Sequence, residues 1–341
     1  MQKPELHEIA DNIFAYVQPN GSWGLSNAGL VVSAEGALLV DTLFDYEHTR
    51  RMLTALGQAS ARARSIDVVV NTHANGDHCY GNALLKGSRI IASDATKNEM
   101  VQMPPAKLAG LMLAAKAFVA LGPARKPLGS MMRSLKLTKA AHLFEAAPYV
   151  MNAFERFNFR DIELAVPTET FTEHLSVTLG ERLVELTKVG PAHTEGDVIA
   201  HVPDARVVFA GDVLFVGHHP LVWAGTVSDA IAACERITAL DVDVVVPGHG
   251  PITDKAGVES QIQYLRALLD EARAMIADGV PESEATLRLM QSGFGSRGLP
   301  ERLAVNVHAA YCELQVGTKR NDVIALFAAM GKLEAAALAT A

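Results

Sequence analysis

Cysteine is scarce in this chain, because only Cys79, Cys234 and Cys312 occur among its 341 residues. So small and odd a set does not fit a disulfide framework, and it favours reduced thiols in the cytoplasm. The chain also lacks any uncharged apolar run of roughly 18 residues, so we expect no transmembrane helix. Residues 1–8 have no apolar core of a signal peptide, and export is not indicated. These absences predict a soluble cytoplasmic protein.

An excess of positive charge is absent as well, because 30 Lys and Arg stand against 38 Asp and Glu and give a formal net charge of −8. Such a chain has no general attraction to nucleic acid or to anionic membranes. We find no recognisable RNA-binding module, so a nuclease is disfavoured. The 49% of hydrophobic residues are ample for a sizeable core, and we predict a single domain over residues 1–341.

Two imidazoles, a carboxylate and an amide lie within the six residues 73–78, shortly after the apolar run 68–70. In an extended segment residues i, i+2 and i+4 point the same way, so His73, Asn75 and Asp77 would line one face. His78 would then close around an ion from the following turn. This density of ligands predicts a metal site. We interpret the adjoining Cys79 as a small buried residue opening a helix, and not as a nucleophile.

Three further sites follow apolar runs of strand character later in the chain: His193 within 190–197, Asp212 after 207–211, and His249 after 244–248. One His after a strand is usually a structural residue, but four such sites in one chain favour metal binding. Zinc takes His nitrogen and Asp oxygen, and a catalytic zinc site keeps one position open for water.

In this order the residues resemble the metallo-β-lactamase superfamily of metallohydrolases. Its pattern is His-x-His-x-Asp-His, followed by a distant His, a bridging Asp and a final His. Asp41 matches an Asp that commonly ends an early strand in this family and supports the ligands. The resemblance implies an α/β fold, the αββα sandwich of two packed sheets with helices outside and the metal at one edge. The implied metal ligands are His73, Asp77, His78, His193, Asp212 and His249.

Asn75 departs from this pattern, because the family places a His there, and an amide oxygen is a poor zinc ligand beside imidazole. The first metal set therefore keeps only His73, His193 and a share of Asp212. The second set is complete, with Asp77, His78, Asp212 and His249. We predict one firmly bound zinc ion and leave a second ion open. The alternative is a metal-poor, non-catalytic relative that uses the fold to bind a ligand.

The predicted chemistry follows from the ligands. Zinc lowers the pKa of bound water to about 7 and polarises a substrate carbonyl. Asp77 would orient the resulting hydroxide, while His73 and His193 would hydrogen-bond an oxyanion or move protons. These three are the predicted catalytic residues. The predicted substrate contacts, with simple packing as the alternative, are Trp23, Asn75, His219 and Trp223.

We expect a zinc hydrolase for a small hydrophobic compound, cyclic or aromatic, that cleaves a lactone, ester or thioester. Relatives with a His-x-Asn-x-Asp-His motif include proteins labelled as cyclases and a hydrolytic dehalogenase of chlorinated aromatics. The resemblance therefore makes dehalogenation the alternative reaction. A β-lactamase role is disfavoured, because a secreted precursor would be expected for it.

Runs of strand character lie on both sides of a helical middle segment. Before it, we predict a helix over 47–56 and strands over 13–17, 28–32, 37–41, 66–71 and 90–92. After it, we predict helices over 228–240 and 257–277 and strands over 175–179, 183–186, 197–202, 207–210 and 242–246.

The middle segment, residues 95–160, is rich in apolar and small residues and is interrupted by prolines, which predicts helices joined by loops. We interpret it as an inserted lid or cap. It holds six of the eleven methionines, which fits an apolar substrate pocket and ordinary helix packing equally well. Residues 281–341 are predicted to form a helical C-terminal extension.

The same segment is basic, because residues 101–160 contain nine Lys or Arg and only two acidic residues, a balance of +7. A basic rim would attract an anionic substrate such as a carboxylate or a coenzyme A thioester. It could equally meet an acidic face of a second subunit in a homodimer, or lie on a membrane surface without stable insertion. The plainest interpretation is a solvated face.

Overall fold

The computed structural model describes residues 3–315 and 322–340. The chain forms two compact units, each built from two stretches of sequence. We call Met1–Pro105 with Asn158–Arg266 the sandwich unit, and Ala106–Phe157 with Ala267–Ala341 the helical unit.

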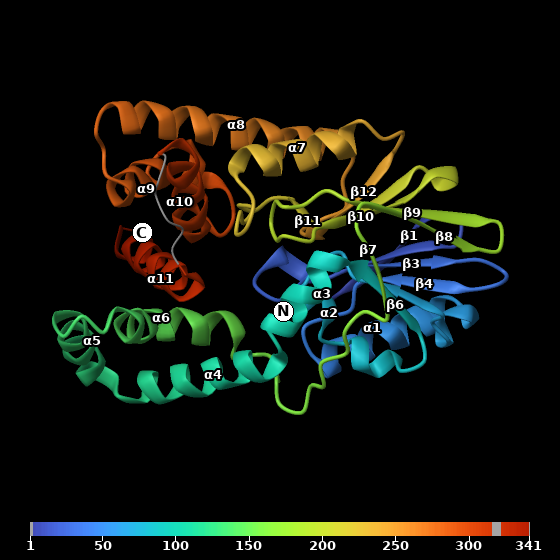
Figure 1. The fold of residues 1–341 in the computed structure, drawn as a ribbon, viewed down its shortest axis with the longest axis horizontal. Coiled ribbons are helices and arrows are strands. Elements are labelled where there is room, and N and C mark those ends of the chain that lie inside the picture. The colour runs from blue at the N-terminus through green and yellow to red at the C-terminus, as the bar shows by residue number, and fades with distance from the viewer. Residues whose placement is uncertain (1–2, 316–321, 341) are drawn as a thin grey trace. The chain divides into compact units, whose positions relative to one another are not determined.

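Two β-sheets make up the centre of the sandwich unit (Figure 1). The first sheet has the order β1 to β7, antiparallel from β1 to β4 and parallel from β4 to β7. Its strands are β1 (Glu5–Ala10), β2 (Ile13–Val17), β3 (Ala28–Val32), β4 (Ala37–Val40), β5 (Val68–Val70), β6 (Arg89–Ser93) and β7 (Glu169–Phe171).

The second sheet has the order β12-β11-β10-β9-β8. Only its β11–β12 pair is parallel. Its strands are β8 (His174–Leu179), β9 (Arg182–Lys188), β10 (Val198–Val202), β11 (Val207–Phe215) and β12 (Val244–His249).

Alternation along the strands divides the apolar residues of the first sheet between two cores. Ile13 and Ala15 of β2 join the core between the sheets, which also contains Phe209 of β11. Phe14 and Tyr16 point to the opposite face, as the period of two requires. There they pack in a second core, to which helix α1 (Tyr46–Ala59) contributes Met52 and Leu56.

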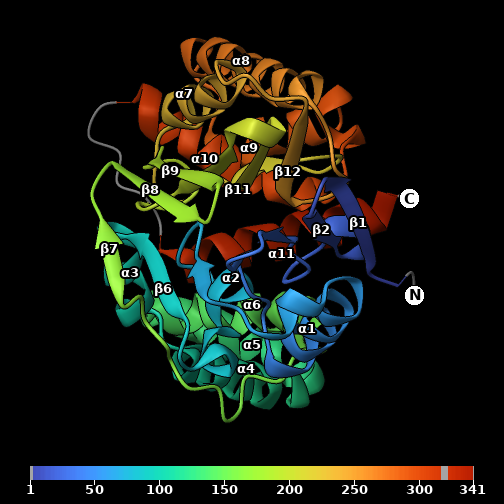
Figure 2. The ribbon, with the colours of Figure 1, turned by 90° about the vertical axis from the view of Figure 1, so that its right-hand side faces the viewer.

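Helices flank both sheets of the sandwich unit, so the predicted αββα order is confirmed (Figures 1 and 2). Helix α1 covers the first sheet, and α7 (Val227–Thr238) lies against β11 of the second. A capping box fixes the start of α7, where Thr226 and Asp229 satisfy each other's backbone N–H groups. The remaining helices of this unit are α2 (Gly76–Cys79), α3 (Asp94–Gln102) and the first part of α8 (Lys255–Ala277).

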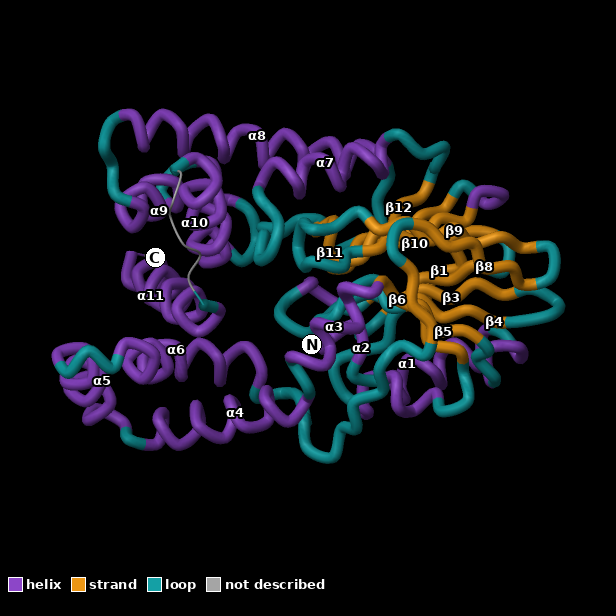
Figure 3. Tube along the Cα trace, in the orientation of Figure 1, coloured by secondary structure: helices purple, strands orange, loops and turns teal. Residues whose placement is uncertain are grey.

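The helical unit contains no strand among its described residues (Figure 3). The Tyr149 hydroxyl donates to Glu301 over 3.0 Å, and Phe154 lies edge-on to Phe327. The predicted middle segment and C-terminal extension thus pack together in one compact unit. Besides the end of α8, its helices are α4 (Pro105–Ala120), α5 (Arg125–Ser134), α6 (Thr138–Phe154), α9 (Glu282–Met290), α10 (Leu303–Leu314) and α11 (Val323–Thr340).

The sequence prediction missed two strands, β1 and β7. Strand β1 pairs only with β2 at the edge of its sheet, and its residues include Glu5, His7 and Glu8, which give no apolar signal. Strand β7 has only three residues, too few for an alternating pattern to register. Strand β11 continues to Phe215, so Asp212 lies within the strand and not after it.

The helical residues Asp94–Ala120 are long and apolar enough to cross a membrane by length and composition alone, and 11% of their most apolar window is buried. This criterion accepts up to two charged residues in a window of 18, whereas the sequence prediction required an apolar run without any charged residue.

Candidate metal centre

The first motif leaves β5 at Val70 and enters helix α2 at Gly76. Asn75 is the N-cap residue of α2, with extended backbone angles, so Asp77 and His78 lie on a short helix. The predicted extended face of alternating residues is therefore wrong beyond Asn75, because the helix places consecutive residues 77 and 78 on one side of the motif. Cys79 is buried as predicted, but it ends this helix and does not open it.

The three later ligands come from the second sheet. His193 lies in the loop between β9 and β10, Asp212 lies in β11, and His249 ends β12. Since β11 and β12 are parallel neighbours, their carboxyl ends bring Asp212 and His249 to the same edge. Nε2 of His249 lies 3.4 Å from Oδ2 of Asp212.

The second metal set is compact. Nε2 of His78 lies 3.1 Å from Oδ1 of Asp212, and Nε2 of His249 lies 3.4 Å from Oδ2 of Asp77. The longest of these separations, between His78 Nε2 and Asp77 Oδ2, is 4.0 Å. Four ligands at about 2.1 Å from a tetrahedral zinc are separated by about 3.4 Å from one another. The four side chains thus lie close together, with Asp212 meeting His78 through Oδ1 and His249 through Oδ2, and their binding of one ion stays a prediction.

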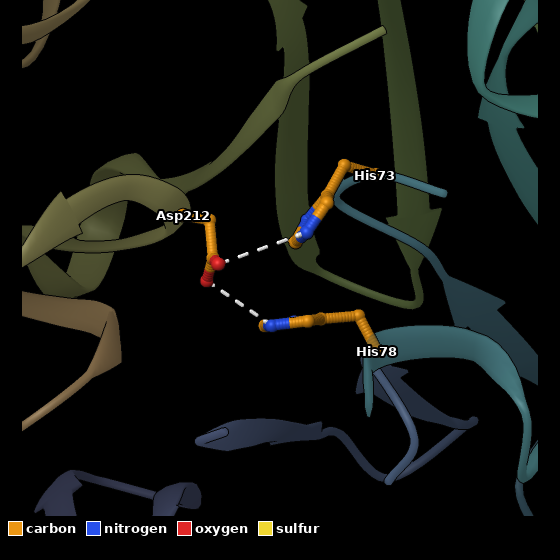
Figure 4. A group of neighbouring side chains, drawn as sticks. All are labelled: His73, His78 and Asp212. Carbon is orange, nitrogen blue, oxygen red and sulfur yellow. Dashed lines mark ion pairs between the residues drawn. The ribbon is translucent and has the colours of Figure 1, made fainter. Parts of the chain in front are cut away.

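The first metal set shares Asp212. Oδ2 of this residue lies 3.3 Å from Nε2 of His193 and 3.9 Å from Nε2 of His73. Figure 4 shows His73 and His78 approaching the Asp212 carboxylate from the same side, each toward its own oxygen. Asp212 therefore has the bridging position that the resemblance implies.

Asn75 occupies the position next to His193 where the family pattern has an imidazole. Its side-chain nitrogen Nδ2 lies 2.8 Å from Nε2 of His193. The hydrogen bond uses the ring nitrogen that an ion in the first set would need. Asn75, the residue at which the sequence departs from the family pattern, therefore also contacts His193 of the first metal set.

Backbone carbonyls hold the rings of two ligands from behind. Nδ1 of His193 lies 2.7 Å from the carbonyl oxygen of Leu221, and Nδ1 of His249 lies 3.1 Å from that of Leu25. A carbonyl only accepts, so each Nδ1 carries a proton, and in the neutral ring Nε2 is then the nitrogen with the lone pair. Such partners fix the tautomer and the orientation of metal-binding His residues.

Asp41, which directly follows β4, orients the ligand rings of the first motif, as its position in the sequence predicted. Its Oδ2 lies 2.8 Å from Nδ1 of His78 and accepts a 2.7 Å bond from the Thr72 hydroxyl. That hydroxyl lies 3.1 Å from Nδ1 of His73, so one carboxylate orients two ligand rings. Asp41 has a φ of 64°, a left-handed conformation that Asp and Asn tolerate better than most residues.

Three buried atoms that face the centre make no well-directed hydrogen bond: Nε2 of His73, Nε2 of His78 and Oδ1 of Asp212. The last two form the 3.1 Å ion pair described above. Buried polar atoms without a well-directed hydrogen bond are costly, and three of them converge here. Two groups of three residues bring their ligand atoms within 4.8 Å of one another: His73, His78 and Asp212, and Asp77, His78 and His249. Imidazole nitrogen and carboxylate oxygen suit zinc, so the donor set fits this ion.

The pKa values of the titratable groups at the centre are shifted in opposite directions. Burial lowers the pKa of His73 well below its ordinary value, so this ring is neutral and can ligate. Burial alone would also lower the pKa of His78, but the carboxylates of Asp212, Asp41 and Asp77 raise it well above the ordinary value. Burial would raise the pKa of Asp212, yet the surrounding imidazoles hold it well below the usual range. Without metal, the centre is therefore an ion-pair cluster.

Burial raises the pKa of Cys79, which keeps this thiol protonated and agrees with a structural role.

Close packing around Asp212 requires glycine at two positions. A Cβ on Gly248 would lie 1.9 Å from Oδ1 of Asp212, and a Cβ on Gly211, whose φ is 53°, would lie 2.6 Å from the Thr72 hydroxyl. Any side chain at these positions would displace a ligand or the residue that supports it.

The two tryptophans singled out in the sequence lie together. The rings of Trp23 and Trp223 are half-buried, tilted by 42°, with centroids 6.4 Å apart. Each stands two residues from a carbonyl that holds a ligand, Trp23 from Leu25 and Trp223 from Leu221. The loops that orient His249 and His193 therefore also carry an aromatic pair.

His219, the other predicted contact in this region, is fully buried, and its Nδ1 lies 2.8 Å from the Tyr264 hydroxyl. A direct substrate contact by this side chain stays a prediction. Sequence reasoning missed Thr72 and the carbonyls of Leu25 and Leu221. A carbonyl leaves no signal in residue type, and a Thr beside a His is too common to mark a site.

Comparisons with known proteins agree with this geometry. The chain is 29% identical over 94 residues to the acyl-coenzyme A thioesterase MBLAC2 of Bos taurus and, over the same length, to that of Homo sapiens. Each match covers 26% of this chain and 33% of the relative, so the chain spans about a third of the length of these curated proteins. A solved metallo-β-lactamase from Pontibacter korlensis has the same fold, with a TM-score of 0.53 and 18% identity over 77% of this chain and 99% of that one.

The pattern of one family matches residues 21–249, which is most of the sandwich unit's sequence and extends from the Trp23 loop to the last ligand, His249. The matched range contains every predicted ligand. This chain belongs to the metallo-beta-lactamase superfamily.

Proposed function

We propose that this protein is a zinc-dependent hydrolase that cleaves an ester-like bond, in a thioester, ester or lactone, of a small hydrophobic substrate. The observation that carries the proposal is the convergence of three buried ligand atoms, Nε2 of His73, Nε2 of His78 and Oδ1 of Asp212, none of which makes a well-directed hydrogen bond. Membership of a hydrolase superfamily supports it. One ion is expected in the set of Asp77, His78, Asp212 and His249.

A bound zinc ion supplies a nucleophilic hydroxide near neutral pH and polarises the substrate carbonyl. Asp77 is the most exposed of the acidic and His side chains in this set, with 13% of its side chain accessible against 4% for Asp212. It can therefore accept a hydrogen bond from the attacking water and hold it in line with the carbonyl. The amide of Asn75 can donate to the developing oxyanion once it leaves His193.

The substrate class follows from the surroundings of the centre. The rings of Trp23 and Trp223 offer an aromatic surface for an apolar acyl, cyclic or aromatic group. The thioesterase activity for which the MBLAC2 relatives are named supports a thioester as the first substrate to test.

Three free thiols, two of them buried, agree with a reducing compartment such as the cytoplasm.

The decisive experiment measures metal and activity on the same sample. We expect about one tightly bound zinc per chain. We also expect hydrolysis of acyl-coenzyme A thioesters, aryl esters or lactones that stops on chelation and returns with zinc. Far less than one ion per chain, with no hydrolysis after zinc is added, would instead support a ligand-binding relative. Chloride release from aryl chlorides without ester cleavage would favour the dehalogenase.

A further inference from the structure

We infer that helix α4 and the turn between α5 and α6, in the helical unit, dock onto the surface of an anionic lipid bilayer. The inference is independent of the proposed hydrolase activity. It rests on apolar side chains exposed beside lysines.

Helix α4 shows an apolar face to solvent. Leu113, Ala117 and Ala120 share one face of the helix through their spacing of four and three residues, and all three are exposed, Leu113 by 67%. The opposite face is packed, because Ala115 is fully buried and Phe118 stacks on Phe144 of α6 at 4.1 Å. A surface helix normally has an apolar face toward the core and a polar face toward solvent, whereas α4 has apolar side chains on both faces.

Exposed apolar residues concentrate in this part of the chain. Ten large hydrophobic residues are exposed among the described residues, and eight of them fall between 101 and 137. Leu135 and Leu137, exposed by 60% and 50%, flank Lys136 in the turn between α5 and α6. Scattered exposed apolar residues are ordinary, but a concentration of this kind marks an interaction surface.

The charge of the segment identifies the partner. Residues 100–144 contain no Asp or Glu and seven Lys or Arg, in a chain with 38 acidic residues. Lys116 lies on α4 between Leu113 and Ala120, and Lys136 and Lys139 adjoin the exposed leucines; all three are exposed. Apolar side chains that enter the acyl boundary, beside lysines that meet lipid phosphates, are what an anionic bilayer surface binds.

A second copy of this chain is a poorer partner for the same surface. A two-fold dimer through it would place lysines of one copy against those of the other, and like charges would repel. A spanning arrangement is also disfavoured, because residues 103–104 divide the stretch 94–120 into α3 and α4. Helix α4 alone has 16 residues where a span needs about 20, and its Phe118 packs against α6. The helix is therefore expected to lie in the interface.

Vesicle co-sedimentation of the full-length protein tests the inference. We expect binding to phosphatidylcholine vesicles that contain phosphatidylserine, little binding to phosphatidylcholine alone, and release at high salt. Each lysine near an anionic surface contributes about a factor of five to binding, so Lys116→Glu with Lys136→Glu should weaken it at least about 25-fold. Leu113→Gln with Leu135→Gln, which leaves the charge unchanged, should also weaken binding.

Matched variants serve as controls. Lys3→Glu with Arg236→Glu makes the same change in charge at exposed positions elsewhere, and Leu287→Gln removes an exposed leucine outside this surface; neither should alter binding. Equal binding to both kinds of vesicle, or to neither, would overturn the inference. Concentration-dependent self-association that Leu113→Gln with Leu135→Gln abolishes would assign the surface to a second copy instead.

Discussion

The side-chain amide of Asn75 donates a hydrogen bond to Nε2 of His193. The direction follows from the far side of the ring, where the Leu221 carbonyl can only accept, so Nδ1 carries the proton and Nε2 has the lone pair. Asn75 thus uses the electrons that an ion in the first set would take. This contact supports the prediction that the first set binds an ion less tightly than the second.

Changing Asn75 to His should therefore strengthen binding of a second ion. Imidazole restores a trio with His73 and His193 and is a better zinc ligand than an amide. If the native enzyme uses one zinc, filling this set should reduce kcat. Metal titration and steady-state kinetics on the variant and its parent make the comparison.

Asn75→Ala is the matched control, because it frees Nε2 of His193 without adding a ligand. A second ion that binds Asn75→His and accelerates turnover would show that Asn75 merely weakens a dinuclear site. Absence of a second ion would mean that the geometry of the pocket, and not this residue, sets the stoichiometry.

His249→Ala should lose both metal and activity, because the ring closes the four-ligand set with Asp77, His78 and Asp212. Elemental analysis and the hydrolysis assay measure the two losses on one sample. His174→Ala, an exposed His on β8, should retain both. A His249→Ala protein with a full complement of metal would place the ion in the other set.

Asp41→Asn should lower zinc affinity by about 10- to 100-fold while the fold is kept. Asn tolerates the left-handed backbone of this position, but it removes the negative charge behind His78 and one of the oxygens shared with Thr72. Asp161→Asn is a close control, because Asp161 is exposed and has the same φ of 64°. Competition with a zinc chelator gives the affinities, and equal values for the two variants would remove Asp41 from the ligand support.

Asp197 should make the stability of the metal-free protein depend on pH. Burial raises the pKa of this carboxyl to about 7, although Thr194 donates two hydrogen bonds to it. Between about pH 4 and pH 7 the unfolded chain has released the proton that the folded chain keeps, so the free energy of unfolding falls as pH rises. Asp197→Asn should flatten this fall in denaturant titrations, and the exposed Asp11→Asn should not. An unchanged slope in Asp197→Asn would assign the pH dependence to other groups.

The sequence predicted which residues converge, because metal chemistry restricts the types of residue that can serve as ligands. The structure brings the six predicted ligands to one centre, and their binding of metal stays a prediction: His73, Asp77, His78, His193, Asp212 and His249. Asp41 was identified through its place after a strand. The strands β2, β3 and β10 to β12 were predicted to within a few residues, except for the long end of β11, because burial on both faces leaves a continuous apolar run. Strands β8 and β9 were predicted because their apolar and polar residues alternate.

Other features depend on contacts that residue type does not encode. The carbonyls of Leu25 and Leu221 hold two ligand rings, yet any residue could supply them. The chain was expected to stay extended as far as Asp77, but helix α2 begins at Gly76. That the middle segment and the C-terminal helices form one unit rests on contacts such as Tyr149 with Glu301, which are 152 residues apart in sequence. A lid role for the middle segment stays a prediction.

The ligands of the second set are spread over residues 77 to 249, and they come from both sheets. During synthesis the chain emerges from its N-terminus, so 248 residues precede the last ligand. A nascent chain that ends before His249 can form the first sheet and offer His73, Asp77 and His78, but it cannot complete a high-affinity site. If the second set binds zinc as we propose, tight binding can therefore only follow the pairing of β11 with β12, and an ion bound earlier by the first motif alone would be held weakly.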